Sequence, residues 1–128
     1  MIEQWHQLVA SKNVHELANL LADDAVLHSP VIHTPVPGKK MVQMYLTAAF
    51  HTFLNDKFTY INEFTKENGA VLEFTTEIDG IFINGIDMIT WDAEGKITEF
   101  KVMIRPIKGL NLINDKMTAL LEQMKSQA

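Results

Sequence analysis

The chain has 128 residues, of which 47% are apolar and 21% charged, and it contains no cysteine. This length predicts one domain, residues 1–128, with a core that needs neither disulfides nor a structural metal. The absence of cysteine excludes thiol nucleophiles, zinc ribbons and disulfide scaffolds. A net charge of −5 with a single arginine argues against a nucleic-acid partner.

Nothing in the sequence indicates a membrane segment. The longest apolar runs are far too short to span a bilayer, and the first residues lack the basic start and apolar stretch of a signal peptide. We therefore expect a cytoplasmic protein without a membrane partner.

The first 24 residues predict two short helices. Apolar residues recur at three- and four-residue steps, with a break near residues 11–13. The second helix is expected to use Asn13 as its N-cap, with Glu16 completing a capping box. Asp23 and Asp24 are expected to end the helical pattern.

A strand, a loop and a long helix are expected next. Residues 25–30 predict a short strand that ends at Pro30. Three prolines and a glycine within residues 30–38 indicate a loop with a fixed path. Residues 39–54 give the clearest helix, because their apolar side chains follow one stripe.

The second half of the chain changes to a period of two residues, which is typical of strands. Asn68-Gly69, Asp79-Gly80 and residues 92–95 are hairpin signals that separate these strands, so neighbours should pair antiparallel. After Pro106 an amphipathic pattern predicts a last helix. The strands cover four ranges, residues 58–61, 70–78, 83–91 and 97–105.

This order of elements predicts an α+β fold in which the early helices cover one face of a curved sheet. With that order, residues 21–26 (LADDAV), Ser29-Pro30 and residues 87–97 (DMITWDAEGKI) resemble the NTF2-like superfamily in its SnoaL-like branch, which includes ketosteroid isomerases and polyketide cyclases. The resemblance covers residues 1 to about 105. It implies a cone-shaped half-barrel with an apolar pocket, and a homodimer that we expect to form through the outer sheet face.

The resemblance also locates the ketosteroid isomerase groups. Trp5 stands where those enzymes have a tyrosine that donates to the oxyanion, and Ser29 stands where they have the aspartate base. Asp87 matches their second donor, an aspartate held protonated. Because two of the three groups differ, steroid isomerisation by that mechanism is not expected.

Asp87 is the strongest candidate for chemistry. It lies between Ile86 and Met88, on the same side of its strand as Ile83 and Ile89. Burial in an apolar pocket would raise the pKa of its carboxyl and make it a proton donor or general acid/base near neutral pH. The alternative is a structural carboxyl that accepts a hydrogen bond from the Trp5 indole or from loop amides.

Two more side chains are candidates to assist Asp87. The resemblance points Tyr45 into the pocket, where its hydroxyl is a possible donor, although a core aromatic is slightly favoured. His33 is expected on the loop near the pocket mouth, where a histidine suits proton transfer, although a histidine that only packs the loop is the favoured interpretation. No standard metal-ligand spacing is present, and neither a metal nor a cofactor is expected.

The remaining candidates line the pocket. Trp5 either stacks on a flat ligand or simply anchors the first helix, which is favoured, and Ser29 offers a hydrogen bond. The other lining residues are Leu72, Phe74, Phe100 and Val102.

Three functions stay open at this point. The first is a binding protein for a small apolar or aromatic molecule. The second is an acid/base enzyme, such as an isomerase, cyclase or dehydratase, that acts on a small carbonyl compound through Asp87. A protein-interaction module is a third possibility, which would need a large exposed apolar patch.

Overall fold

A computed structural model describes residues 1–127. The chain forms helix α1 (Ile2–Ser11), a 3-10 turn (Val14–Glu16), helix α2 (Leu17–Leu20), strands β1 (Leu21–His28) and β2 (Val36–Pro37), helix α3 (Lys39–Phe53), strands β3 (Thr59–Lys66), β4 (Gly69–Ile78), β5 (Ile81–Trp91) and β6 (Ile97–Arg105), and helix α4 (Ile107–Ser126). The α+β order expected from the sequence is confirmed.

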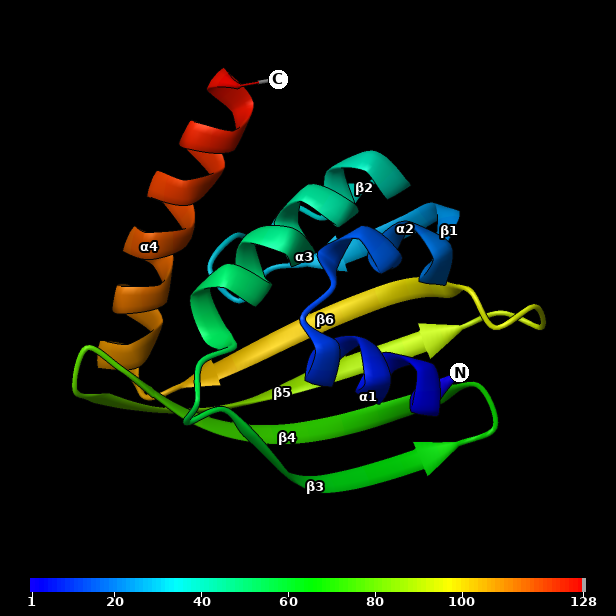
Figure 1. Ribbon diagram of the computed structural model, residues 1–128, viewed down its shortest axis with the longest axis horizontal. Helices are drawn as coiled ribbons and strands as arrows, with labels where there is room; N and C mark the ends of the chain where they lie inside the picture. The colour runs from blue at the N-terminus through cyan, green and yellow to red at the C-terminus, as the bar shows by residue number, and fades with distance from the viewer. Residues whose placement is uncertain (128) are drawn as a thin grey trace.

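The strands form one curved six-stranded sheet in the order β2-β1-β6-β5-β4-β3. Strands β3 to β6 are an antiparallel meander, whereas β1 pairs parallel with β6, so the sheet is mixed. Helices α1, α2 and α3 lie over the concave face, and α4 stands across one end of the sheet (Figure 1).

Two local predictions about the first residues are wrong. Asn13 makes no side-chain capping bond, and the carboxylate of Glu16 instead accepts a hydrogen bond from Asn19, so no capping box forms. Strand β1 begins at Leu21, four residues before the expected start, and it contains Asp23 and Asp24. Both carboxylates point to solvent where the pairing of β1 with β6 shifts register, so the strand accommodates them.

Two glycines permit close approaches that shape the concave face. A Cβ atom at Gly85 of β5 would stand 2.6 Å from the Phe74 ring, so the glycine allows that ring to pack directly against β5. At Gly109 of α4 a Cβ atom would stand 2.9 Å from the Ile83 side chain, so α4 can approach β5 closely. The expected last helix is therefore part of the packed structure, in contact with α3, β5 and β6.

Candidate functional site

Three elements bring one polar side chain each to the concave face. Residues 83, 85, 87 and 89 of β5 are all buried, so the alternation of the strand turns Asp87 toward the helices. On β3, Tyr60 pairs with Phe74, whose ring is on the same inner face. Trp5 lies on α1 directly above, and its side chain is only 1% exposed.

These three side chains form a hydrogen-bonded chain. The indole Nε1–H of Trp5 donates to the Tyr60 hydroxyl oxygen at 3.1 Å, and the Tyr60 hydroxyl donates to Oδ2 of Asp87 at 2.5 Å. An indole can only donate, so the Tyr60 oxygen is the acceptor in the first bond, and the Tyr60 hydroxyl keeps its own proton for Asp87. A distance of 2.5 Å is typical of a hydroxyl bonded to a carboxylate.

Burial decides the protonation of this pair. Asp87 is 8% exposed, and the loss of hydration raises the pKa of its carboxyl to about 7, although the Tyr60 hydrogen bond acts in the opposite direction. Burial, with the charge and the hydrogen bond of Asp87, raises the pKa of the Tyr60 phenol well above its ordinary value. Near neutral pH, Asp87 is therefore poised between acid and carboxylate, and Tyr60 stays protonated.

The second oxygen of Asp87 remains accessible. Every fully buried side-chain oxygen or nitrogen within residues 1–127 has a hydrogen-bond partner. Oδ1 makes no hydrogen bond to that part of the chain, whereas Oδ2 is held by Tyr60. It follows that Oδ1 faces open space.

That space is a small apolar cavity between α1, α3 and the sheet, which we call the inner chamber. Its volume is about 40 Å³, and Asp87 is the one carboxyl in its wall. Aromatic rings supply much of the rest, including an edge-to-face pair of Trp5 with Phe50. The wall consists of Trp5, Val9, Leu46, Ala49, Phe50, Phe53, Leu54, Phe58, Tyr60, Phe74, Asp87, Phe100 and Val102.

A second apolar cavity, the outer chamber, lies between α3, α4, β6 and the loop after β1. Its volume is about 70 Å³. It shares four wall residues with the inner chamber, so the two cavities are neighbours. The wall consists of Leu27, Ser29, Pro30, Val31, Ile32, Tyr45, Leu46, Ala49, Phe53, Val102, Ile104, Ile113, Asn114, Met117, Thr118 and Leu121.

The sequence-predicted pocket residues separate into these two chambers. Trp5, Phe74, Asp87 and Phe100 line the inner chamber, and Val102 lines both. Ser29 and Tyr45 line the outer chamber, so they do not share a cavity with Asp87. The Ser29 hydroxyl also accepts a hydrogen bond from the backbone amide of Val31.

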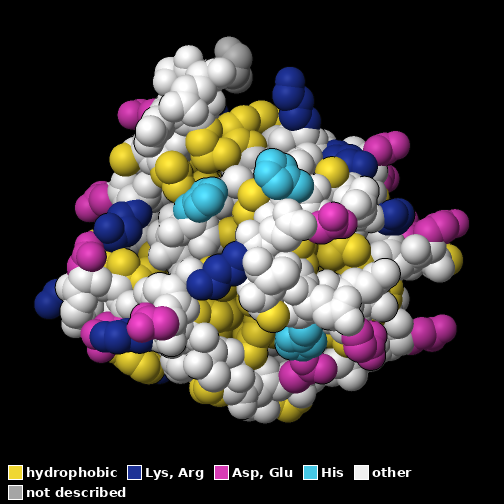
Figure 2. Space-filling view, in the orientation of Figure 1, with side chains coloured by type: hydrophobic (Ala, Val, Ile, Leu, Met, Phe, Trp, Pro, Cys, Tyr) yellow, Lys and Arg dark blue, Asp and Glu magenta, His cyan; other side chains and the backbone are white. Residues whose placement is uncertain are grey.

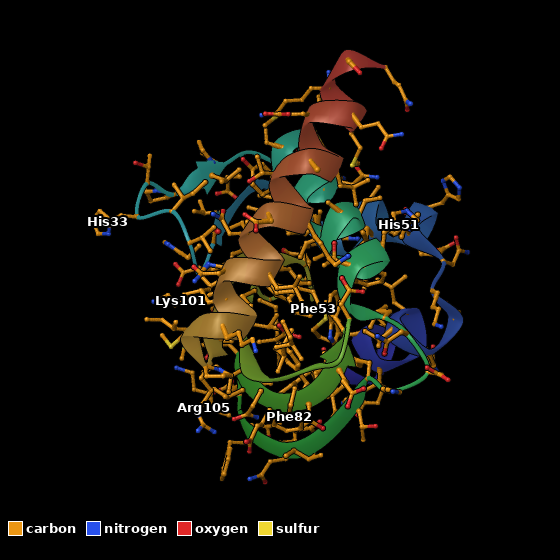
Figure 3. All side chains as sticks on the ribbon, turned by 90° about the vertical axis from the view of Figure 1, so that its left-hand side faces the viewer. His33, His51, Phe53, Phe82, Lys101 and Arg105 are labelled. Carbon is orange, nitrogen blue, oxygen red and sulfur yellow. The ribbon has the colours of Figure 1, made fainter. Side chains whose placement is uncertain are left out.

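Two predicted residues are in neither chamber. Leu72 is 0% exposed and belongs to the sealed core beside Asp87, its partner across the β4–β5 pairing. His33 is exposed on the loop after β1 and points away from the body of the molecule (Figure 3). The structure therefore does not bring His33 to Asp87.

Tyr60 is the residue of the candidate site that sequence reasoning missed. Its strand was predicted, but only over residues 58–61, which is too short to reveal which side chains face inward. The signal was present, since Phe58 and Tyr60 are two residues apart and both line the inner chamber. The expected bond from Trp5 to Asp87 is in fact relayed through the Tyr60 hydroxyl.

Within residues 1–127, no three His, Cys, Asp or Glu side chains are grouped so that they could hold a metal ion. Over the same residues, no helix is both long enough and apolar enough to cross a membrane.

Comparison with known proteins identifies the fold and the family. The family model described as SnoaL-like domain matches residues 2–100. The structure is similar to a steroid delta-isomerase from Pseudomonas aeruginosa, with 34% identity, coverage of 98% of this chain and 91% of that one, and a TM-score of 0.92. No curated protein matches the chain significantly.

Two other solved structures are similar as well. A bacterial protein with a cystatin-like fold from Silicibacter pomeroyi is 26% identical, with coverage of 92% of this chain and 82% of that one and a TM-score of 0.85. A putative ketosteroid isomerase from Kribbella flavida shares 12% identity over 82% of this chain and 75% of its own, with a TM-score of 0.66, which supports the fold alone. By its family match and its fold, this chain belongs to the SnoaL-like family of NTF2-like proteins, which includes ligand-binding and isomerase-type members.

Proposed function

We propose that this protein binds a small apolar molecule in the inner chamber and holds a carbonyl oxygen of that molecule by a hydrogen bond from protonated Asp87. The observation that carries the proposal is the accessible Oδ1 of a buried carboxyl in an otherwise apolar wall. Pockets of this kind bind through apolar contact and take their specificity from a few convergent polar groups.

The size of the site limits the ligand. A cavity of about 40 Å³ is far below the several hundred cubic ångströms of pockets for drug-sized molecules. The inner chamber by itself therefore suits the carbonyl-bearing end of a molecule rather than a whole steroid. Trp5 then both lines the chamber with its ring and anchors α1, because its N–H donates to the Tyr60 hydroxyl and not to a ligand.

The test is the pH dependence of binding. With 4-fluoroacetophenone as the ligand, fluorine NMR should show an affinity that is constant below pH 6 and decreases about tenfold per pH unit above pH 7, because the carboxylate cannot donate. Asp87→Asn is the matched variant: its amide still donates, so its affinity should not change with pH. Equal pH dependence in both proteins, or no saturable binding by either, would contradict the proposal.

An acid/base enzyme is the second candidate, favoured by the raised pKa of Asp87 and by the similarity to a steroid delta-isomerase. In this function the Asp87 carboxylate would take a proton from the carbon beside the carbonyl. The C–H electron pair would form the C=C bond of an enolate as the C=O π pair moves to the oxygen, and the same carboxyl would return the proton. Asp87 is the one carboxyl in either chamber wall, so a mechanism that needs a second carboxyl has none there.

Hydrogen exchange distinguishes catalysis from binding. The methyl protons of 4-fluoroacetophenone exchange with deuterated water only through the enolate, and proton NMR follows the loss of their signal. Exchange that is faster with the wild type than with Asp87→Asn would establish the enzyme. Equal exchange rates, together with pH-dependent binding by the wild type, would establish the binding protein.

We also propose that the partner of this chain is a second copy, bound through the outer sheet face, and that the protein is cytoplasmic. The outward side of the sheet exposes large apolar side chains, with Phe82 57% and Met103 49% exposed. Basic side chains lie singly among other groups on the face shown in Figure 2, which does not favour a nucleic-acid partner.

A further inference from the structure

We infer that α4 and the outer chamber form the second half of the same ligand site, so that the ligand is a carbonyl compound with an apolar tail and α4 selects it by that tail. The inference rests on the proposed function of the inner chamber. It goes further because it assigns a role to a helix and a cavity that the Asp87 site does not use.

The two chambers share part of their walls. Leu46, Ala49, Phe53 and Val102 belong to both walls. Phe53 is the largest of the four, and its ring lies between α3 and α4 when the molecule is viewed from the α4 end (Figure 3). A molecule that begins at Asp87 and extends past Phe53 therefore enters the outer chamber directly.

The wall from α4 is suited to an alkyl or ring-shaped tail. Ile113, Met117 and Leu121 follow one another at four-residue spacing, which puts them on one side of the helix, and all three line the chamber. A methionine in such a wall adapts to tails of different shape. The tail would be buried among apolar carbons.

Polar side chains mark the rim of the outer chamber. Asn114 and Thr118 of α4 line it and are exposed, and Tyr45 of α3 lines it from the opposite side. Among residues 1–127, none of these three side chains donates a hydrogen bond to another group. They are available to a hydroxyl or amide at the far end of the ligand.

Helix α4 begins at Ile107, beyond residues 2–100 that the family model matches. Apart from Val102, the wall of the inner chamber, with Asp87, is inside the matched part. The head of the ligand would accordingly be recognised by residues that the family model covers, and its tail in part by a helix beyond them.

The experiment measures affinity as a function of tail length. The ligands are acetophenones with a methyl, ethyl, butyl or hexyl group opposite the carbonyl, and calorimetry or ligand NMR gives the dissociation constant. Burial of each methylene should tighten binding about fourfold. The gain should stop once the tail fills the outer chamber and reaches its polar rim.

A matched pair of variants tests the role of α4. Thr118→Trp would put a large ring at the rim of the outer chamber, whereas Ala119→Trp puts the same ring on the neighbouring exposed position, which lines neither chamber. Both positions are exposed, so neither variant should disturb the core, and circular dichroism melting verifies this. We expect Thr118→Trp to lose at least tenfold in affinity for the butyl compound and little for the methyl compound, and Ala119→Trp to match the wild type.

The outcomes separate the two proposals. Binding of the methyl compound whose pH dependence is lost in Asp87→Asn, without any gain from longer tails, would refute the role of α4 and keep the proposed function. An equal gain in the wild type and in Thr118→Trp would refute the role of α4 as well. If no compound binds, or if the pH dependence of binding is the same in the wild type and in Asp87→Asn, the proposed function itself fails.

Discussion

Replacement of Asp87 by asparagine should change how the stability of the protein depends on pH. The ordinary pKa of an aspartate is 3.8, and burial raises the pKa of Asp87 to about 7 in the folded protein. Between these values the unfolded chain has an ionised Asp87 while the folded chain keeps it protonated. Rising pH therefore favours the unfolded chain across this window, and the effect is complete above pH 7.

The size of the effect follows from the difference in pKa. About three pH units at about 1.36 kcal/mol for each unit give a loss of roughly 4 kcal/mol between pH 3.8 and pH 7. This is a large share of the 5 to 15 kcal/mol that a domain of this size has in total. Asparagine has no charge to bury, and its carbonyl oxygen can still accept the Tyr60 hydrogen bond.

Urea unfolding of the wild type and Asp87→Asn, from pH 4 to pH 8.5, measures this difference. The variant should gain roughly 4 kcal/mol relative to the wild type as pH rises to 7, and the difference should be constant above that pH. Asp115→Asn is the control, because Asp115 is an exposed carboxyl on α4 that lines neither chamber. Free energies of unfolding that run parallel for the wild type and Asp87→Asn would refute the assignment of a buried, protonated carboxyl.

Three further changes test the neighbourhood of the site. Tyr60→Phe removes a hydrogen bond that favours the carboxylate, so the pKa of Asp87 should rise further. Carbon NMR of the carboxyl would show this as a titration midpoint at higher pH, and an unchanged midpoint would contradict the bond. Gly85→Ala would place a methyl group 2.6 Å from both the Phe74 ring and the Met103 carbonyl oxygen, so we expect a loss of about 1 to 3 kcal/mol of stability in urea unfolding. No loss would contradict this close packing around Gly85. Met103→Glu puts a charge on the outer sheet face, so light scattering should show the expected dimer for the wild type and a monomer for the variant. A wild-type monomer would contradict the proposed dimer, and a variant that stays dimeric would exclude this face.

The sequence predicted the part of the site that depends on alternation within one strand. Apolar neighbours at residues 83, 86, 88 and 89 were enough to place Asp87 on a strand, on the same side as Ile83 and Ile89, but not to decide whether that side is the concave one. The structure buries that side. The direction of the pKa change followed from burial, which is why the sequence also anticipated a carboxyl poised near neutral pH.

What escaped the sequence depends on contacts between distant residues. Tyr60 and Asp87 are 27 residues apart, and the hydrogen bond from Trp5 crosses 55 residues, so no local pattern reports them. The separation of Tyr45 from Asp87 has the same origin, since it is Phe53 and its neighbours that divide one expected pocket into two chambers.

The sequence by itself determined the nature of this protein: an α+β domain without thiol chemistry, in a recognisable family, with one carboxyl at an apolar strand position. Those features depend on composition, periodicity and local motifs, which a sequence contains directly. Only the tertiary structure decided that Tyr60 is the partner of Asp87, that His33 is not, and that α4 closes a second chamber. These properties depend on the curvature of the sheet and on how the helices pack upon it, and both arise from the sum of many long-range contacts.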